Sequence, residues 1–171
     1  MWYLSMMLGE GAKTGQPRST LCREFSTFAK KRPMRDPEKT IGTMADKQKI
    51  AFLGSVDAEG FPNVKAMLRP RKREGIREFW FTTNTSSMRV GQFLENPKAC
   101  VYFCDQRFFR GAMLRGTVEV LTDDLSKQMI WQDGDEQYYP LGVTDPDYCV
   151  LRFTAASGRF YSNFKSESFE L

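Results

Sequence analysis

The residues best suited to bind a charged ligand follow a short apolar strand in the middle of the sequence. Residues 79–82 favour a pleated, half-buried strand, and small hydroxyl and amide side chains then interrupt the apolar run. From Ser87 the apolar spacing becomes that of a helix, which ends at Asn96-Pro97. A helix N-terminus presents unpaired N–H groups and the positive end of its dipole. With Arg89 in the first turn, the stretch predicts a phosphate site; an ordinary capped helix is the alternative, and both roles can coexist.

The order of residues in this stretch also matches a known flavin-binding turn. The pattern is F-x-T-N, two residues, S-x-[K/R], a short helix and N-P, and residues 81–97 follow it without a gap. The stretch resembles the flavin-binding turn of the pyridoxamine 5′-phosphate oxidase family. From about residue 34 to the C-terminus, the chain resembles the general-stress-protein-26-like branch of the FMN-binding split barrels.

The resemblance implies a mainly β (α+β) fold, a six-stranded split barrel with a few short helices that forms a homodimer through its sheet. In the family, FMN lies across the dimer interface, with its phosphate at the central helix and its ring along the strand before the central one. Lys65 matches the first basic residue of that strand, although a solvated strand lysine is the alternative. The FMN-binding residues that the resemblance implies are Lys65, Ala66, Met67, Leu68, Thr82, Thr83, Ser86, Ser87, Met88 and Arg89.

Several positions depart from the oxidases that act on pyridoxamine phosphate. Met88 replaces a residue that is often basic, which leaves Arg89 as the principal cation. Pro70 and Arg71 stand near the place of a substrate-side lysine, and Gly111 stands near the place of a glutamine that contacts the flavin ring in some relatives. Residues 163–171 lack the Arg and His substrate contacts. The resemblance therefore implies an FMN-dependent oxidoreductase with a different small-molecule electron donor, and it assigns no catalytic residue.

Three other functions are open on the sequence. The protein could bind flavin without turnover as a stress-linked sensor or carrier, or it could use the deazaflavin F420, as related barrels do. It could also bind single-stranded RNA through the six basic residues between Lys65 and Arg77. The balanced charge of residues 34–171 and the acidic connection before Tyr148 argue against RNA. The late aromatic residues Trp131, Tyr138 and Tyr139 either approach the partner's flavin, as in the family, or plug the barrel.

Composition sets the remaining limits. At 171 residues, 41% hydrophobic and 27% charged, the chain can form one globular domain, and no apolar run approaches membrane-spanning length. The net charge of +4 resides in residues 1–33, which hold six basic and two acidic residues. We expect a basic, disordered leader at 1–33 and a split-barrel domain at 34–171. Four cysteines and no histidine argue for a reducing cytoplasm and against zinc, and they exclude a histidine-ligated haem.

The apolar pattern predicts many short strands and a few helices, typical of a closed β architecture. Strands are expected at residues 50–56, 62–68, 79–82, 99–103 and 112–121, with a final hairpin of 148–154 and 159–161. Helices are expected at 37–49, 87–95 and 123–131, the last capped by Thr122. Charged residues 71–75 read as a loop, and 132–147 read as a polar, acidic connection.

Overall fold

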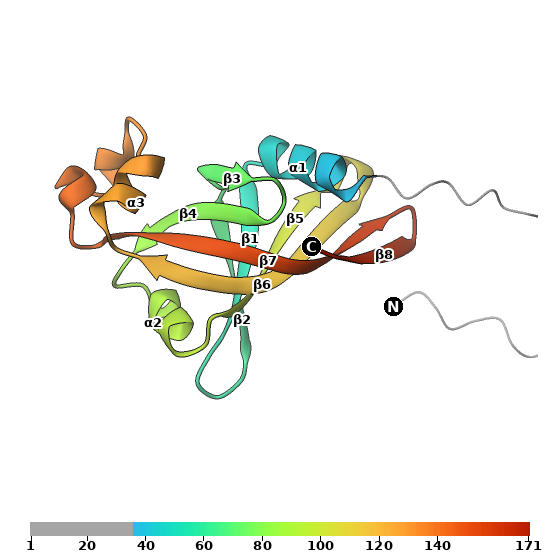
Figure 1. The fold of residues 1–171 in the computed structure, drawn as a ribbon, viewed down its shortest axis with the longest axis horizontal. Coiled ribbons are helices and arrows are strands. Elements are labelled where there is room, and N and C mark those ends of the chain that lie inside the picture. The colour runs from blue at the N-terminus through green and yellow to red at the C-terminus, as the bar shows by residue number, and fades with distance from the viewer. Residues whose placement is uncertain (1–35) are drawn as a thin grey trace, which may run out of the picture. The chain divides into compact units, whose positions relative to one another are not determined.

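The computed structural model describes residues 36–171, so the leader predicted for residues 1–33 lies outside the described residues. The strands are β1 (Ile50–Val56), β2 (Pro62–Leu68), β3 (Lys72–Glu74), β4 (Glu78–Asn84), β5 (Lys98–Asp105), β6 (Arg110–Leu121), β7 (Tyr148–Ser162) and β8 (Lys165–Glu170). The helices are α1 (Pro37–Lys47), α2 (Met88–Glu95) and α3 (Asp124–Ile130) (Figure 1). None of the helices in this part of the chain is long and apolar enough to cross a membrane.

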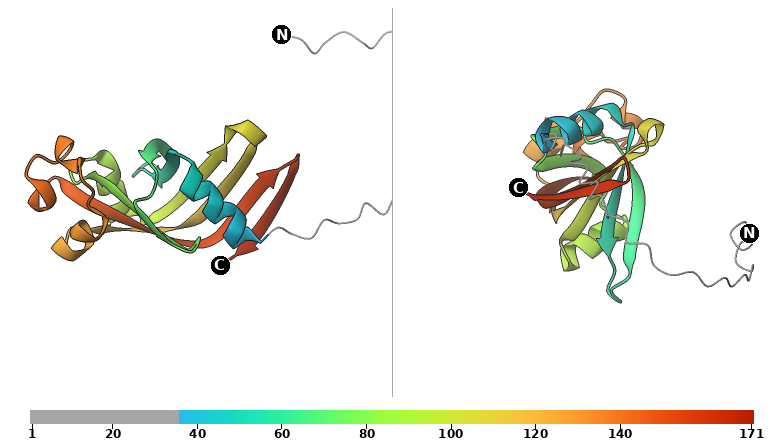
Figure 2. Two further views of the ribbon diagram at one scale, coloured as in Figure 1. Left: turned by 90° about the horizontal axis from the view of Figure 1, so that it is seen from above. Right: turned by 90° about the vertical axis from the view of Figure 1, so that its right-hand side faces the viewer.

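All eight strands belong to one antiparallel sheet in the order β2-β1-β5-β6-β7-β4-β3, with β8 beside β7. The sheet is strongly curved, and β1 and β2 run across the direction of β6 and β7 (Figures 1 and 2). The mainly β split-barrel class predicted from the sequence is confirmed, but the sheet has eight strands in place of six.

The additional strands have clear physical origins. β3 is a three-residue edge strand in the stretch expected to be a charged loop. The predicted final hairpin is wrong, because β7 continues through residues 155–158 and returns as β8. The register shifts between Arg115 and Gly116, where Ala156 of β7 is the extra residue of a bulge, and β6 pairs with β7 on both sides of it. A Cβ on Gly116 would come within 1.9 Å of the Thr154 carbonyl oxygen, so only glycine fits there.

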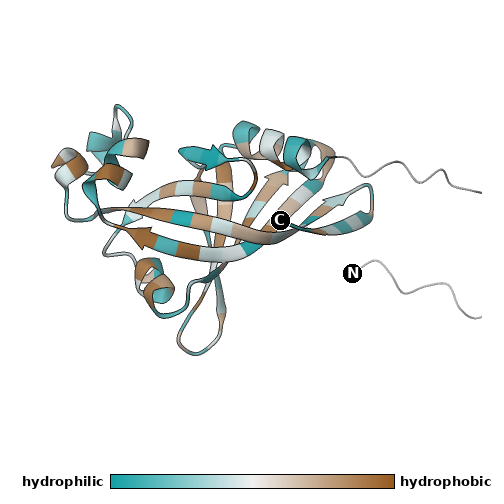
Figure 3. Cartoon of the chain, in the orientation of Figure 1, coloured by the Kyte–Doolittle hydropathy of each residue, from teal (hydrophilic) through white to brown (hydrophobic). Residues whose placement is uncertain are grey.

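The main core fills the concave side of this sheet. Phe79, Phe81 and Phe153 are fully buried from β4 and β7, and Phe103 of β5 packs 5.5 Å from Phe79 between ring centroids. The core also receives Ile41 and Met44 of α1 and Val90 and Phe93 of α2. Hydrophobic and hydrophilic residues alternate along parts of β6, as expected for strands with one buried face (Figure 3). The core therefore fixes α2 against the sheet.

A second cluster lies on the other face of β4. Trp80 alternates with Phe79 and Phe81 and packs with Ile130, Tyr139 and Tyr148. The Tyr148 hydroxyl donates a hydrogen bond to the Lys127 carbonyl oxygen at 3.1 Å. α3 begins after Asp123, whose carboxylate accepts the Ser126 N–H at 2.9 Å, so the predicted cap at Thr122 is wrong. Tyr139 therefore packs outside the main core and does not plug the barrel, while Tyr138 is exposed.

Candidate anion and cofactor site

Residues 84–87 carry the chain from the end of β4 to the first turn of α2. The Ser87 N–H donates to the Asn84 carbonyl at 3.0 Å, and the Val90 N–H donates to the Ser87 carbonyl at 2.9 Å. Ser87 is the N-cap residue of α2, but its hydroxyl makes no capping hydrogen bond. Its Oγ is buried and has no hydrogen-bond partner among the described residues. Buried hydroxyl groups in proteins are nearly always paired, so this one is suited to a ligand atom.

Arg89 lies in the first turn of the same helix. The residue is only 8% exposed, and its Nε is buried without a hydrogen-bond partner in residues 36–171. No ion pair joins its guanidinium to a described acidic residue. Burial lowers the pKa of this guanidinium, although arginine remains charged near neutral pH. A buried cation without a counter-charge is unfavourable, and an anion in contact with it would remove that penalty.

The turn before α2 is fastened to the chain just before β7. The Asp147 carboxylate accepts the Asn84 side-chain amide and the Ser86 backbone N–H, each at 2.7 Å. The Thr85 N–H donates to the Asp147 carbonyl at 2.8 Å. The hydrogen bonds from Asn84 and Ser86 lower the pKa of the Asp147 carboxyl group. The Ser86 N–H is therefore used within the protein, whereas the first N–H groups of α2 have no intrahelical acceptor.

The two residues flanking Ser87 are more open to solvent. Ser86 is exposed, and Met88 is 72% exposed. A ligand contact from Met88 would therefore come through its backbone N–H, at the helix N-terminus. The FMN contacts predicted for both residues stay predictions.

The predicted contact residues of β2 alternate between the two faces of the sheet. Lys65 lies opposite the fully buried Leu53 and shares its face of the sheet, on which α2 packs through a 2.6 Å hydrogen bond from Ser55 Oγ to Gln92 Oε1. Met67 is buried on the same face. The Arg69 N–H donates to the Lys49 carbonyl of the neighbouring chain segment at 3.0 Å.

This bond fixes the direction of the β2 backbone groups. In an antiparallel ladder the residues that pair with the neighbour alternate along the strand. The backbone groups of Lys65 and Met67 therefore face β1, as those of Arg69 do. The backbone groups of Ala66 and Leu68 face the free edge of the sheet, since β2 is an end strand.

The two threonines at the end of β4 point to opposite faces. Thr83 is 6% exposed and follows the alternation of Phe79 and Phe81, which places it on the side of α2. Thr82 follows the alternation of Trp80, which places it on the face of the second cluster. The structure thus gathers Thr83, Ser87 and Arg89 on one side, and it places the Thr82 side chain on the other.

A cleft of about 610 Å³ with a basic lining lies where β2 ends, beside α1 and β3. Its basic residues are Lys49, Arg69, Arg71, Lys72 and Arg73. Three of them form ion pairs with carboxylates: Arg71 with Asp135, Lys72 with Glu74, and Arg73 with Asp46. The Asp46–Arg73 pair lowers the pKa of the acid and raises that of the base. The sequence pattern did not reveal these ion pairs. Because of them, fewer cations of the predicted RNA-binding stretch are free to hold a nucleic-acid backbone.

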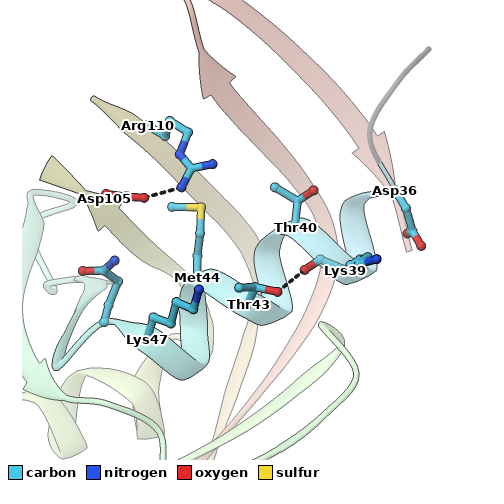
Figure 4. A pocket seen from close by; sticks show the side chains of 9 residues that line it. Asp36, Lys39, Thr40, Thr43, Met44, Lys47, Asp105 and Arg110 are labelled. Atoms are coloured by element: carbon cyan, nitrogen blue, oxygen red, sulfur yellow. Dashed lines mark hydrogen bonds and ion pairs between the residues drawn. The ribbon is translucent and has the colours of Figure 1, made fainter. Parts of the chain in front are cut away.

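A smaller cavity of about 360 Å³ lies between α1 and the β5–β6 turn (Figure 4). Met44 lies in its centre, Lys47 lines it from α1, and Arg110 forms an ion pair with Asp105 on the opposite side. This pairing lowers the pKa of Asp105. Neither this cavity nor the basic cleft is lined by Ser87 or Arg89, so both are separate from the candidate anion site.

Gly111 lies beneath a tyrosine, an arrangement that the sequence did not indicate. It pairs with Cys104 across β5 and β6, and a Cβ at Gly111 would come within 1.9 Å of the Tyr102 Oη. The Tyr102 phenol therefore occupies the space that a longer side chain at this position would need. Burial raises the pKa of Tyr102. The only sequence signal for this arrangement is Tyr102 itself, two positions before Cys104, the residue that pairs with Gly111.

This chain is similar in sequence and in fold to known proteins. A model of the pyridoxamine 5′-phosphate oxidase family matches residues 38–162. A structure from Clostridium acetobutylicum, described as related to general stress protein 26 of B. subtilis and the pyridoxinephosphate oxidase family, is 42% identical; the match covers 79% of this chain and 94% of that chain, with a TM-score of 0.73. A search among curated proteins gives no match.

More distant structures share the fold alone. A pyridoxamine 5′-phosphate oxidase-related, FMN-binding protein from Nostoc punctiforme is 12% identical, with 81% of this chain and 98% of that chain covered and a TM-score of 0.60. A heme binding protein from Mycobacterium smegmatis is 14% identical, with 80% and 58% covered and a TM-score of 0.65. From the family match and the 42% identity, this chain belongs to the pyridoxamine 5′-phosphate oxidase family.

Proposed function

We propose that this protein binds FMN as a homodimer and uses it as an oxidoreductase with a small-molecule electron donor. The observation that carries the proposal is the pair of buried polar groups at the start of α2, Ser87 Oγ and Arg89 Nε, which have no partner among the described residues. A phosphate bound there would accept hydrogen bonds from both groups and from the first N–H groups of the helix. These residues fit the phosphate end of FMN.

β2 is suited to the rest of the cofactor. Lys65 lies on the face of the sheet that carries α2, so its long side chain can reach toward a phosphate or ribityl group. Ala66 and Leu68 offer N–H and C=O groups at a free strand edge. A flavin ring has donors and acceptors along one edge and could pair with such groups. We assign Met67 to the packing beneath this strand and Thr83 to the side of α2.

A second protomer would cover the open site. Ala66, Phe52, Tyr102 and Met113 lie in register across β2, β1, β5 and β6 and form one row on the outer face of the sheet. Phe52 and Tyr102 are each 36% exposed, and the next row adds Ile50 at 48% and Leu68 at 55%. An exposed apolar sheet face of this kind is suited to a large dimer interface.

The chemistry assigned to the chain is limited to binding and orientation. When bound, FMN supplies the capacity to accept a hydride and to pass electrons on. The chain's own groups would hold the phosphate, align the ring along β2 and exclude water with the second protomer. β8 carries Lys165, Ser166 and Glu167 where an oxidase acting on pyridoxamine phosphate would need Arg and His contacts, so we propose a different donor. We place the protein in the cytoplasm.

The test begins with the visible spectrum of freshly purified protein and mass spectrometry of the released cofactor. We expect the released cofactor to be FMN. Release of F420 would show that the protein uses the deazaflavin in place of FMN. Oxygen uptake and flavin reduction are then measured with NADH, NADPH and pyridoxamine phosphate. Bound FMN that no donor reduces would favour a flavin-binding module without turnover. A colourless protein that ignores added FMN, or a salt-dependent complex with single-stranded RNA in its place, would contradict the proposal.

A further inference from the structure

The chain segment before β7 holds the cofactor turn through one carboxylate. Asp147 accepts Asn84 Nδ2 through Oδ2 and the Ser86 N–H through Oδ1, both at 2.7 Å. Its carbonyl accepts the Thr85 N–H at 2.8 Å. Three consecutive residues of the turn are thus fixed by one residue that lies more than 60 positions later in the sequence. The residues that follow directly are Ser87 and the first turn of α2.

Asp147 is itself held in place by buried groups. The Asp147 N–H donates to Asp145 Oδ1 at 2.9 Å, and the Leu141 N–H donates to Asp145 Oδ2 at 3.2 Å. Asp145 is 7% exposed, and its carbonyl accepts Lys127 Nζ at 3.3 Å. Lys127 is 6% exposed. A line of hydrogen bonds therefore joins α3 to the turn before α2.

We infer that Asp147 is a positioning residue for the phosphate of the bound flavin, which it does not itself contact. This inference rests on the proposed function. The carboxylate is a negative group close to a proposed anion site, and by charge alone it would weaken phosphate binding. Its positive contribution is geometric, because it sets the direction of the turn that presents Ser87 and the N–H groups of α2. The two effects have opposite signs, so a single substitution separates them.

Asp147→Asn removes the charge and keeps the size. The amide has one oxygen acceptor, so it can satisfy Ser86 or Asn84, and its NH₂ group must face the other donor. If positioning dominates, FMN affinity falls; if charge repulsion dominates, FMN affinity rises. Riboflavin, which has no phosphate, serves as the probe for the rest of the site. A general structural loss would weaken both ligands equally.

The experiment titrates flavin fluorescence with the full-length wild-type protein and three variants. For Asp147→Asn we expect the Kd for FMN to rise at least about tenfold, the effect of one charge-assisted hydrogen bond, and the Kd for riboflavin to change less than about twofold. Asp123→Asn is the matched control, because Asp123 also accepts a turn N–H but at the start of α3. It should leave both constants unchanged. Asn84→Ala, which keeps the carboxylate, should shift FMN in the same direction by a smaller factor and serves if Asp147→Asn does not fold.

The outcomes separate the two claims. Unchanged or tighter FMN binding by Asp147→Asn, or equal weakening of FMN and riboflavin, would overturn the role of Asp147 and leave the proposed function standing. Failure of the wild-type protein to bind FMN would overturn the proposed function and this inference together.

Discussion

Ser87 and Arg89, two residues apart at the start of α2, each bury a polar side-chain atom that no group in residues 36–171 satisfies. Ser87 holds the N-cap position without making the usual capping bond, and Arg89 is a buried cation that forms no ion pair with a carboxylate of residues 36–171. Either feature alone would be a local defect. Together, at a helix N-terminus, they describe a site that is complete only with an anion bound.

Removing the Arg89 charge should stabilise the protein when no flavin is bound. Arg89→Met keeps much of the side-chain volume and removes an unpaired buried charge, so the melting temperature of the flavin-free protein should stay equal or rise. Stabilisation by added FMN should be lost in the same variant. Differential scanning fluorimetry with and without FMN measures both effects. Arg77→Met, at an exposed arginine, is the control; a large drop in melting temperature for Arg89→Met alone would show that the arginine has an internal structural role.

Ser87→Ala distinguishes the ligand site from an ordinary cap. Loss of a serine cap usually lowers protein stability by about 1 kcal/mol. Because Ser87 Oγ makes no capping bond, we expect the free energy of unfolding of the flavin-free protein to change by less than about 0.5 kcal/mol, within the usual range for neutral substitutions. FMN binding should weaken. Urea denaturation of the flavin-free protein gives the first quantity, and a loss near the usual capping value would support the simple helix cap.

A charge on the outer sheet face should separate the protomers. Phe52 lies at the centre of the row formed with Ala66, Tyr102 and Met113, so Phe52→Glu would bury a carboxylate in the proposed interface. We expect the mass measured by light scattering to fall from dimer to monomer, with weaker FMN binding. Leu125→Glu changes an 81% exposed leucine on α3 and should leave the dimer intact. A Phe52→Glu protein that remains dimeric would place the interface elsewhere.

High pH should destabilise the fold through Tyr139. Burial, with smaller effects of Cys149 and Asp135, raises the pKa of Tyr139 from 10.0 to about 12. The folded protein therefore holds this proton more tightly than the unfolded chain. The resulting stability is complete below pH 10 and is lost as the pH rises through about 12. Thermal melts between these values should show a smaller decline for Tyr139→Phe than for wild type, and Tyr138→Phe, at an exposed tyrosine, should behave like wild type. Equal declines for all three would show that Tyr139 does not control this response.

The strand pattern predicted much of the fold, because local apolar alternation decides it. β1 and β2 begin and end at the predicted residues, since Asp57 and Gly60 mark their turn and the strands are bounded by polar residues. β8 was missed because Lys165, Ser166 and Glu167 carry no apolar alternation; it forms by pairing with the end of β7. The continuity of β7 was also missed. It depends on a bulge at Ala156, which has no partner on β6, and no local apolar pattern marks such a bulge.

In the candidate site, too, local residue types predicted some residues and missed others. Ser87 and Arg89 were predicted from hydroxyl and basic residues at a helix start, and the structure adds that their polar atoms are buried and unpaired. Asp147 was not predicted, because its separation of 61 positions from Ser86 hides the contact from any local pattern. The opposite directions of Thr82 and Thr83 follow from strand alternation, which the family pattern does not express.

The most direct test of the central claim is the ratio of the riboflavin and FMN dissociation constants, measured in wild type and in Arg89→Met under the same conditions. If Arg89 and Ser87 hold the flavin phosphate, wild type should prefer FMN by at least about tenfold, and most of this preference should disappear in the variant, a loss of about 1.5–3 kcal/mol for a hydrogen bond to a charged group. Equal affinity of wild type for the two flavins, or a preference for FMN that survives in Arg89→Met, would contradict the account.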